Sequence, residues 1–556
     1  MNYEEKAYQI IKNSIKSAIF IDEKARSFFL PESKLKGYSE EELSVNLYNN
    51  FKKNGISLSI HKFIKGEEED INLKKYLFED RDLVLLDWKL DGNYGEDLSL
   101  KLLSDIIQAP HINFCAIYTS QADVSEIYKN LLSYFSGKNT LYFNQLKQEF
   151  EADENELKAI FSRFDILNTK SYGRLIPELK NIDDNFLERL RKTAKEDDIK
   201  EALKNLYIAF QQFNLSETEL HKPDIISVSD RTLVINNTFI AILEKDKQND
   251  ASHLIEILAT QFSKSKNSFT HLLGFEMQAI FAKEGSFIDS NLLTVSLDAL
   301  LVHRNYILET DNSDIPFKIL IKNILIEHAS MRLRTAKLAL LEDNFLNDIS
   351  TTVNSRPTDE SMAAMNVFYN SVKIDILNCE NLPNLNFGDV FETNDGKYFI
   401  CITALCDCYL PSKIENIFYF AEGSPISNDL ALTLGDTAFM SFLPNKKVVS
   451  WIAFEPDKIN YNSESESTED LKTAVKYFKQ FKYKPVYVKP HAYNVKSCKI
   501  ENGQIEIRRV ETKEEKEDIN FISLKYITTI RPNYTQRIAN HAFSHPIRVG
   551  VDFVKR

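Results

Sequence analysis

Two strand-like segments near the N-terminus end in acidic side chains that could take part in chemistry. The apolar run at 83–86 leads directly into Asp87, and a second run at 17–21 leads into Asp22 and Glu23. Most charged side chains lie on the protein surface, so an acid that ends a buried strand needs a specific reason. Three carboxylates together would suit a hard cation, and Asp87 could also accept a phosphoryl group.

A third strand-like run, at 113–118, ends in two hydroxyl side chains, Thr119 and Ser120. In an open parallel sheet the carboxyl ends of the strands lie along one edge, and ligands bind there. If the three runs are parallel strands of one sheet, the acids and hydroxyls are expected to meet at that edge.

The segments around these runs alternate between strand and helix patterns. One helix is expected to begin at Ser39, because acids fill its first turn, and to end near Gly55. Strands that alternate with helices indicate a parallel α/β sheet. The expected elements are a helix at 3–15, a strand at 17–22, the helix from 39, strands at 56–63 and 82–87, a helix at 96–107, a strand at 113–119 and a helix at 123–136.

A fifth strand is needed to complete this sheet. The candidate is the segment 164–173, and the residues before it, 141–163, are expected to form an inserted helical pair. The first domain would then end near residue 180.

In this order on strand ends, the residues resemble the receiver domain of bacterial response regulators. That family has an acid pair after its first strand, an acceptor Asp after the third, a Thr or Ser after the fourth and a Lys after the fifth. The resemblance covers about residues 1–180, and it includes a glycine that ends the loop after the acceptor, here Gly95. The matching positions are Asp22 and Glu23, Asp87, Thr119 and Lys170.

The resemblance implies a phosphoryl acceptor that depends on magnesium. Asp87 would be the phosphoacceptor, and Mg²⁺ would be held by Asp22, Glu23, Asp87 and the backbone carbonyl of Lys89. The cation would neutralise the incoming phosphoryl oxygens beside a carboxylate that is otherwise a poor nucleophile.

The resemblance gives two further residues a contact with the phosphoryl group. Lys170 would pair with its oxygens as a point charge, and Thr119 would hydrogen-bond one oxygen and move on phosphorylation. The implied donor is a histidine-kinase-like or phosphotransfer protein. Lys170 lies 51 positions after Thr119, more than twice the family's usual separation, so the inserted helices are required.

Length and composition predict a soluble chain of about two to four domains. The 556 residues carry a net charge of −13, which argues against a general nucleic-acid coat. Six cysteines in so long a chain indicate a reducing compartment rather than a disulfide framework. The N-terminus lacks a signal-peptide pattern and no long apolar stretch follows, so we expect a cytoplasmic protein with no membrane contact.

The rest of the chain changes from helical to strand patterns. Asn394–Gly396 and Asn502–Gly503 are typical of hairpin turns, while 225–235 looks like a small hairpin and 470–482 like a helix. The predicted fold is multidomain, with α/β, α and β parts in that order. The parts are a flavodoxin-like, doubly wound parallel sheet at 1–180, a mainly helical domain at 181–355 and a β-rich C-terminal module at 356–556.

The C-terminal module contains a group of three cysteines, Cys401, Cys406 and Cys408. Strand alternation would place Cys406 and Cys408 on one face and Cys401 on the other. Neither a CxxC pair nor a nearby histidine completes a zinc site. Packing in the core is therefore favoured over a metal or redox role.

Three functions remain open on this evidence. The first is a phosphorelay signalling protein whose receiver-like domain regulates an output module of unknown activity, and such large receiver proteins resemble components of bacterial conflict or anti-phage phosphorelays. The second is a docking or scaffold protein without phosphoryl chemistry, which would be favoured if Lys170 cannot reach Asp87. The third is an effector enzyme with its site near Cys406, Asp407 and His541.

The C-terminal segment 531–556 has five basic residues and one acid. A nucleic-acid or partner surface there is the alternative to a solvated face that balances the acidic remainder of the chain. We favour the solvated face, because the interleaved aromatic residues match no RNA-binding motif.

Overall fold

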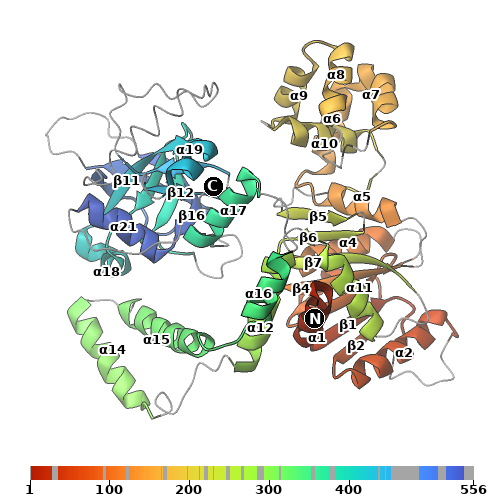
Figure 1. Cartoon of the computed structure of the whole chain (residues 1–556), viewed down its shortest axis with the longest axis horizontal. Coiled ribbons are helices and arrows are strands. Elements are labelled where there is room, and N and C mark those ends of the chain that lie inside the picture. The colour runs from red at the N-terminus through yellow and green to blue at the C-terminus, as the bar shows by residue number, and fades with distance from the viewer. Residues whose placement is uncertain are drawn as a thin grey trace. The chain divides into compact units, whose positions relative to one another are not determined.

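The computed structural model describes most of the chain in two compact units (Figure 1). The first unit is 1–286 with 329–352, and the second is 287–328 with 353–556. The described residues are 2–27, 36–91, 95–109, 111–119, 124–164, 166, 172–196, 198–211, 213–217, 223–229, 231–245, 251–264, 268–284, 294–311, 315–351, 357–374, 382–435, 439–444, 446–452, 488–510 and 521–543.

The first unit contains a seven-stranded sheet in the order β2-β1-β3-β4-β7-β6-β5. The first five strands in this order pair in parallel, and β6 and β5 continue the sheet as an antiparallel hairpin. The strands are β1 (Ser17–Asp22), β2 (Ser57–Lys62), β3 (Leu83–Asp87), β4 (Asn113–Thr119), β5 (Ile225–Ser229), β6 (Thr232–Ile235) and β7 (Thr238–Glu244).

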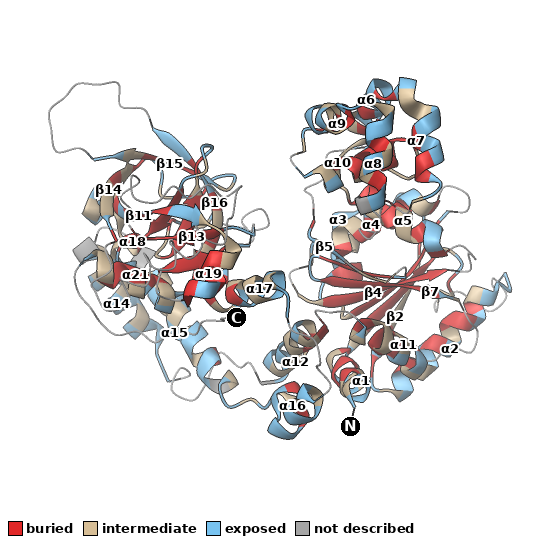
Figure 2. Ribbon diagram, turned by 45° about the horizontal axis from the view of Figure 1, so that its top comes forward, coloured by how far each residue is buried: buried red, intermediate tan, exposed pale blue. Residues whose placement is uncertain are grey.

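Helices cover both faces of this sheet, as the strand sequences require. All residues of β3 and β4 are buried, which is typical of strands covered on both sides. One core cluster joins alternate strand residues to α1 (Tyr3–Ser14), α2 (Ser39–Lys53), α11 (Ala251–Ser263) and α12 (Ser268–Glu284). The other joins the remaining strand residues to α3 (Ile71–Phe78), α4 (Gly95–Ile106) and α5 (Val124–Tyr134). Figure 2 shows the central strands of the sheet as buried. The predicted doubly wound, flavodoxin-like sheet is therefore confirmed.

The prediction of a fifth parallel strand at 164–173 is wrong. The parallel neighbour of β4 on the side away from β3 is β7, and residues 172–182 form a helix, α8. The apolar residues Ile166, Leu175 and Leu179 pack in a separate helical core rather than in the sheet. The sheet therefore continues to residue 244, beyond the end expected near residue 180.

The inserted segment between α5 and β5 is a bundle of five helices with a hydrophobic core of its own. It begins near the predicted residue 141 but extends well past 163. Both views show the bundle next to α5, beyond the layer of helices that covers the sheet (Figures 1 and 2). The helices are α6 (Thr140–Glu149), α7 (Glu154–Phe161), α8 (Tyr172–Ile182), α9 (Phe186–Ala194) and α10 (Ile199–Ala209).

The helical middle of the chain continues through the division between the units. Its helices are α14 (Leu297–Asp311), α15 (Ile315–Leu333), α16 (Asp343–Ser350) and α17 (Asp359–Asn370). In the described part of the chain, no helix combines the length and the hydropathy needed to cross a membrane.

The second unit is built on antiparallel strands, as the hairpin turns predicted. Pairing in the order β10-β9-β16-β15-β14-β11 and back to β10 closes a six-stranded, barrel-like ring, and β12, β13 and β8 extend it. Asn502 and Gly503 both have positive φ, as their hairpin turn requires. The strands are β8 (Ser371–Val372), β9 (Asp389–Glu392), β10 (Tyr398–Cys401), β11 (Ile417–Ile426), β12 (Met440–Phe442), β13 (Val448–Ser450), β14 (Pro490–Val495), β15 (Gln504–Arg509) and β16 (Ile522–Ile530).

Three short helices accompany the ring in the second unit. They are α18 (Leu405–Tyr409), α19 (Asn428–Leu434) and α21 (Pro532–Ala542). The helix predicted at 470–482 and the C-terminal segment beyond 543 lie outside the described residues.

Candidate functional site

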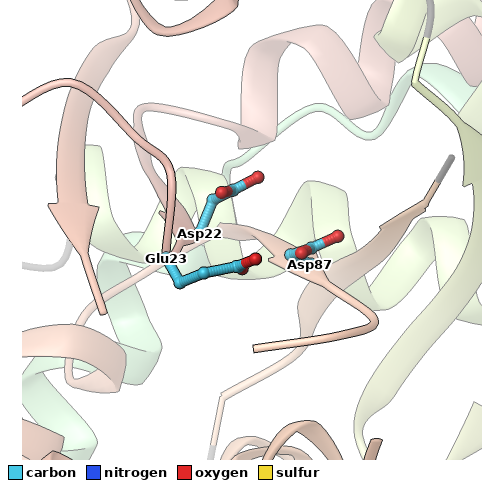
Figure 3. Close-up of side chains that lie close together, drawn as sticks. All are labelled: Asp22, Glu23 and Asp87. Carbon is cyan, nitrogen blue, oxygen red and sulfur yellow. The ribbon is translucent and has the colours of Figure 1, made fainter. Parts of the chain in front are cut away.

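Three carboxylates lie together at the carboxyl edge of the parallel sheet (Figure 3). Asp22 ends β1, Glu23 follows it, and Asp87 ends β3, which pairs with β1 in parallel. One oxygen from each carboxylate lies within 4.8 Å of the others. The pairing register that aligns the ends of β1 and β3 therefore brings together the three acids that the sequence indicated.

A lysine that the sequence did not indicate bridges two of these acids. Lys245 Nζ lies 2.6 Å from Asp22 Oδ2 and 2.9 Å from Asp87 Oδ1. Lys245 follows the last residue of β7, and its backbone N–H donates to the carbonyl of Thr119 at 2.7 Å. This backbone hydrogen bond fixes the end of β7 against the end of β4, so the lysine side chain reaches across to the acids.

Lys170, the lysine assigned from the sequence, lies outside the described residues. The lysine that follows the fifth parallel strand is Lys245, because β7 rather than 164–173 occupies that place in the sheet. The sequence carries a local signal for it, an apolar run at 239–243 that ends in a glutamate and a lysine. That run lies too far along the chain for a spacing rule to find.

The electrostatic state of Asp87 reflects its burial and its neighbours. Burial and the charges of Asp22 and Glu23 raise the pKa of Asp87, and Lys245 opposes them, with a net value of about 7. Burial lowers the pKa of Lys245, but the charges of Asp87 and Asp22 outweigh it, so this pKa is raised. The lysine is therefore a permanent cation, while the three acids repel one another.

The donor set at this edge fits a hard divalent cation. Glu23 Oε2 is buried and has no hydrogen-bond partner among the described residues. The other oxygen, Oε1, lies 3.4 Å from Lys24 Nζ, but a buried carboxylate oxygen without a hydrogen bond beside two other acids is still costly unless a cation contacts it. Carboxylate oxygens are the ligands that Mg²⁺ prefers, so Asp22, Glu23 and Asp87 are suited to hold it.

The loop after Asp87 is held tightly against the start of α4. A Cβ on Gly95 would lie 2.4 Å from the backbone nitrogen of Leu90 and 2.6 Å from the carbonyl carbon of Lys89. Ser99 Oγ donates to the carbonyl of Asp87 at 2.9 Å, which fixes the end of β3 to the same helix. Lys89, whose carbonyl was predicted to bind the metal, therefore belongs to a packed loop, and residues 92–94 lie outside the described residues.

Substitution of Gly95 tests how strongly this loop is packed. We expect Gly95→Ala to destabilise the first unit by about 1–3 kcal/mol, because the added methyl group would meet backbone atoms that cannot rotate away. Urea unfolding of the full chain, followed through the fluorescence of Trp88, measures the loss. An unfolding midpoint equal to that of the wild type would contradict the close approach.

Thr119 ends β4 on the same edge and is 2% exposed. Its carbonyl accepts the hydrogen bond from Lys245, so the threonine and the lysine are neighbours along the backbone ladder. Ser120, the second hydroxyl noted in the sequence, lies outside the described residues.

The cysteine group of the C-terminal module forms no comparable site. Cys401 and Cys408 are 0% and 3% exposed and belong to a hydrophobic core cluster, which agrees with the packing role favoured from the sequence. The predicted strand alternation is wrong, because β10 ends at Cys401 and residues 405–409 form α18. Among the described residues, the only hydrogen-bond partner of the exposed Cys406 is Asp407.

The histidine considered with these cysteines lies elsewhere in the second unit. The ring of His541 packs edge to face on Phe439, with 4.6 Å between centroids. Among the described residues, Asp22, Glu23 and Asp87 are the only group of three or more His, Cys, Asp or Glu side chains whose ligand atoms lie within 4.8 Å of one another, so Cys406, Asp407 and His541 do not converge in this way.

Comparison with known proteins identifies the N-terminal fold independently of this geometry. A family model described as the response receiver domain matches residues 14–166. No curated protein and no solved structure matches the chain. The matched segment includes Asp22, Glu23, Asp87 and Thr119 and ends before β7, which supplies Lys245. Residues 14–166 of this chain thus belong to the response receiver domain family.

Proposed function

We propose that this chain is a phosphorelay signalling protein in which Asp87 accepts a phosphoryl group. A receiver domain supports phosphorelay-type signalling in general, and such domains interact with histidine kinases or phosphotransfer proteins. The observation that carries the proposal is the position of Asp87, at the end of β3, beside two further acids and bridged by a buried lysine.

The residues at this edge are of the types that aspartyl phosphorylation would require from the protein. A carboxylate oxygen of Asp87 forms a bond to phosphorus while the bond from phosphorus to the donor's leaving atom breaks. Asp22, Glu23 and Asp87 would hold Mg²⁺ with the carbonyl of Lys89, and the cation would supply positive charge for the transferring oxygens. Lys245 now pairs with the carboxylate of Asp87. After transfer it would pair with an oxygen of the phosphoryl group on Asp87 instead.

Thr119 is the residue that we propose to report the phosphoryl group to the surface. Its hydroxyl would donate to a phosphoryl oxygen. Its backbone carbonyl already accepts the N–H of Lys245. A new charge at Asp87 would then change the position of β4's end and the segment beyond it. We propose that the C-terminal module at 356–556 is the output that this change regulates.

The alternative of docking without phosphoryl chemistry is less favoured by the geometry. That alternative was tied to Lys170, which lies outside the described residues, so that criterion is not tested. A different lysine, Lys245, has its Nζ 2.9 Å from the carboxylate of Asp87, which supports phosphoryl chemistry there. The effector-enzyme alternative lacks the convergence of cysteine and histidine on which it depended.

Magnesium binding can be tested with a tryptophan that the chain already carries. Trp88 follows Asp87 and is 1% exposed, so we expect Mg²⁺ to change its fluorescence. Glu23→Gln and Asp87→Asn should each weaken Mg²⁺ binding by about tenfold or more, because a direct ligand matters at least as much as a residue that supports one.

The matched control for this titration is Asp70→Asn. It makes the same chemical change in the same unit, at the N-cap of α3, where asparagine caps equally well. Equal Mg²⁺ affinities in the wild type and all three variants would show that the acid cluster is not the metal site.

A further inference from the structure

A second candidate site lies at the opposite end of the sheet from Asp87. A cavity of about 1130 Å³ opens beside the residues that precede β1 and β3, Lys16 and Asp82. Its other walls are α1, α12 and the segment 335–339. This volume is slightly above the range of about 300–1,000 Å³ that is usual for pockets that hold small organic ligands.

The charges around this cavity favour an anion. Four lysines and two acids line it. Lys6 is already engaged, because its Nζ bonds the carbonyl of Ala339 at 2.6 Å and pairs with Glu342. Asp82 accepts the backbone N–H groups of Lys16 and Ser17. The remaining cations are therefore available to a ligand.

Two of the remaining lysines, Lys16 and Lys283, have ammonium groups without a partner among the described residues, and both side chains line the cavity. The third, Lys337, also lines it. Ammonium groups converging on one cavity from three segments suit a phosphate-bearing ligand better than a neutral one.

The cavity also contains a hydrogen-bond acceptor without a partner. Glu276 Oε1 accepts the backbone N–H of Ala339 at 2.6 Å, which fixes the side chain. Glu276 Oε2 is buried and has no hydrogen-bond partner among the described residues. An unsatisfied buried acceptor is costly, and a ligand that brings an N–H donor would satisfy this oxygen once the atoms that now cover it move aside.

Part of the remaining lining is apolar. Ile10, Ala279, Ile280 and Ala336 line the cavity and offer an apolar surface on which a planar ring could pack. We propose that the cavity binds a nucleotide, with its phosphates on Lys16, Lys283 and Lys337 and an exocyclic amino group of its base on Glu276.

Such a ligand would join two segments of the first unit that are far apart in the sequence. Lys283 lies three residues before the first unit ends at 286, and 335–339 follows the point at which the chain returns at 329. A bound nucleotide would hold the end of α12 and the segment 335–339 against α1. It would therefore provide a second input to the protein, separate from the acids around Asp87.

Calorimetric titration of the full-length protein in EDTA, which keeps metal from the acid cluster, tests the proposal. The probes are ADP, CDP and GDP, which carry exocyclic amino groups, UDP, which does not, and inorganic phosphate. We expect the three amino-bearing nucleotides to include at least one that binds about tenfold more tightly than UDP, and inorganic phosphate to bind most weakly.

The variants assign the contacts. Lys16→Ala and Lys283→Ala should each lower the affinity for the nucleotide by about tenfold, as expected for loss of a charge-assisted hydrogen bond. Glu276→Gln keeps an acceptor for Ala339 but places an amide –NH₂ at the other position, so it should remove the preference over UDP. Lys75→Ala, an exposed lysine on α3, is the matched control and should change nothing.

The outcomes separate this proposal from the phosphorylation of Asp87. Asp87→Asn should leave nucleotide affinity at the wild-type value. No binding of any nucleotide to the wild-type protein, binding of phosphate as tight as that of nucleotides, or full affinity in both lysine variants would each overturn the proposal.

Discussion

Replacing Lys245 with alanine is expected to destabilise the first unit by about 3–5 kcal/mol in the absence of divalent cations. The substitution would leave Asp22, which is fully buried, and Asp87 without the cation that bridges them at 2.6 and 2.9 Å. Removing one partner of a buried ion pair costs this much because an uncompensated charge stays in the interior. Mg²⁺ should restore part of the loss in the variant, since it would neutralise the same carboxylates.

Urea unfolding with and without Mg²⁺, followed through Trp88, measures both effects. Lys170→Ala is the natural comparison, because the sequence alone assigned that lysine to the same role. We expect Lys170→Ala to retain wild-type stability and phosphorylation, and Lys245→Ala to lose both. The reverse pattern would show that β7 does not provide the functional lysine.

Replacing Asp389 with asparagine is expected to stabilise the second unit at neutral and alkaline pH. Asp389 is fully buried on β9, and burial raises its pKa to about 7 despite hydrogen bonds from Thr529 and the backbone of Asn386. The side chain makes contacts of 2.7 Å with Thr529 Oγ1 and with the N–H of Asn386. An asparagine can keep an acceptor toward the N–H of Asn386. Its amide –NH₂ would face Thr529 Oγ1, so the threonine hydroxyl, which now donates to Asp389, would have to rotate and accept instead.

The pH dependence of this effect follows from the direction of the shift. The unfolded carboxyl ionises near its usual pKa of about 4, while the folded one keeps its proton until about 7. Its contribution to stability is therefore complete below pH 4, declines as pH rises to 7, and stays lost above that. The loss has an upper bound of about 4 kcal/mol, at 1.36 kcal/mol for each pKa unit.

Thermal or urea unfolding from pH 4 to 8 checks this prediction, with Trp451 as the probe of the second unit. The stability difference between Asp389→Asn and the wild type should grow with pH and level off above 7. Asp395→Asn is the opposite control, since hydrogen bonds from Thr393 and Lys397 hold the pKa of that exposed carboxyl below its usual range. A pH-independent difference for Asp389→Asn would contradict the burial of an uncharged acid.

The first four parts of the candidate site could be predicted from sequence because each depends on a short pattern. Asp22, Glu23, Asp87 and Thr119 each follow an apolar run, and parallel pairing places the ends of such runs at one edge. The structure brings the three acids together for that reason. The barrel-like part of the second unit was likewise indicated by local hairpin turns, which need only adjacent residues.

Lys245 could not be predicted in the same way, because sequence patterns give no limit on the length of an insertion. Five helices with their own core separate β4 from the strands that complete the sheet. A loop's closure entropy grows only slowly with its length, so a folded bundle can be inserted without weakening the pairing of β4 with β7. The segment 164–173 satisfied the expected spacing better, but two of its described residues, Phe164 and Ile166, pack within the bundle.

The error at the cysteines has a different physical origin. The residues after Cys401 alternate in polarity as a strand would, yet the chain turns into a short helix at 405–409. The hydroxyl of Thr403 accepts the N–H of Tyr419, which ties the chain just before this helix to β11. A long-range hydrogen bond of this kind leaves no local signal in the sequence.

The central claim, that Asp87 accepts a phosphoryl group, is tested most directly by the mass of the intact protein. The protein is incubated with acetyl phosphate, with Mg²⁺ or with EDTA, and the wild type is compared with Asp87→Asn and Asp70→Asn. We predict the addition of one phosphoryl group to the wild type and to Asp70→Asn only when Mg²⁺ is present, and none to Asp87→Asn. A folded wild-type protein that binds Mg²⁺ but gains no phosphoryl group, or an Asp87→Asn variant that gains one, would contradict the claim.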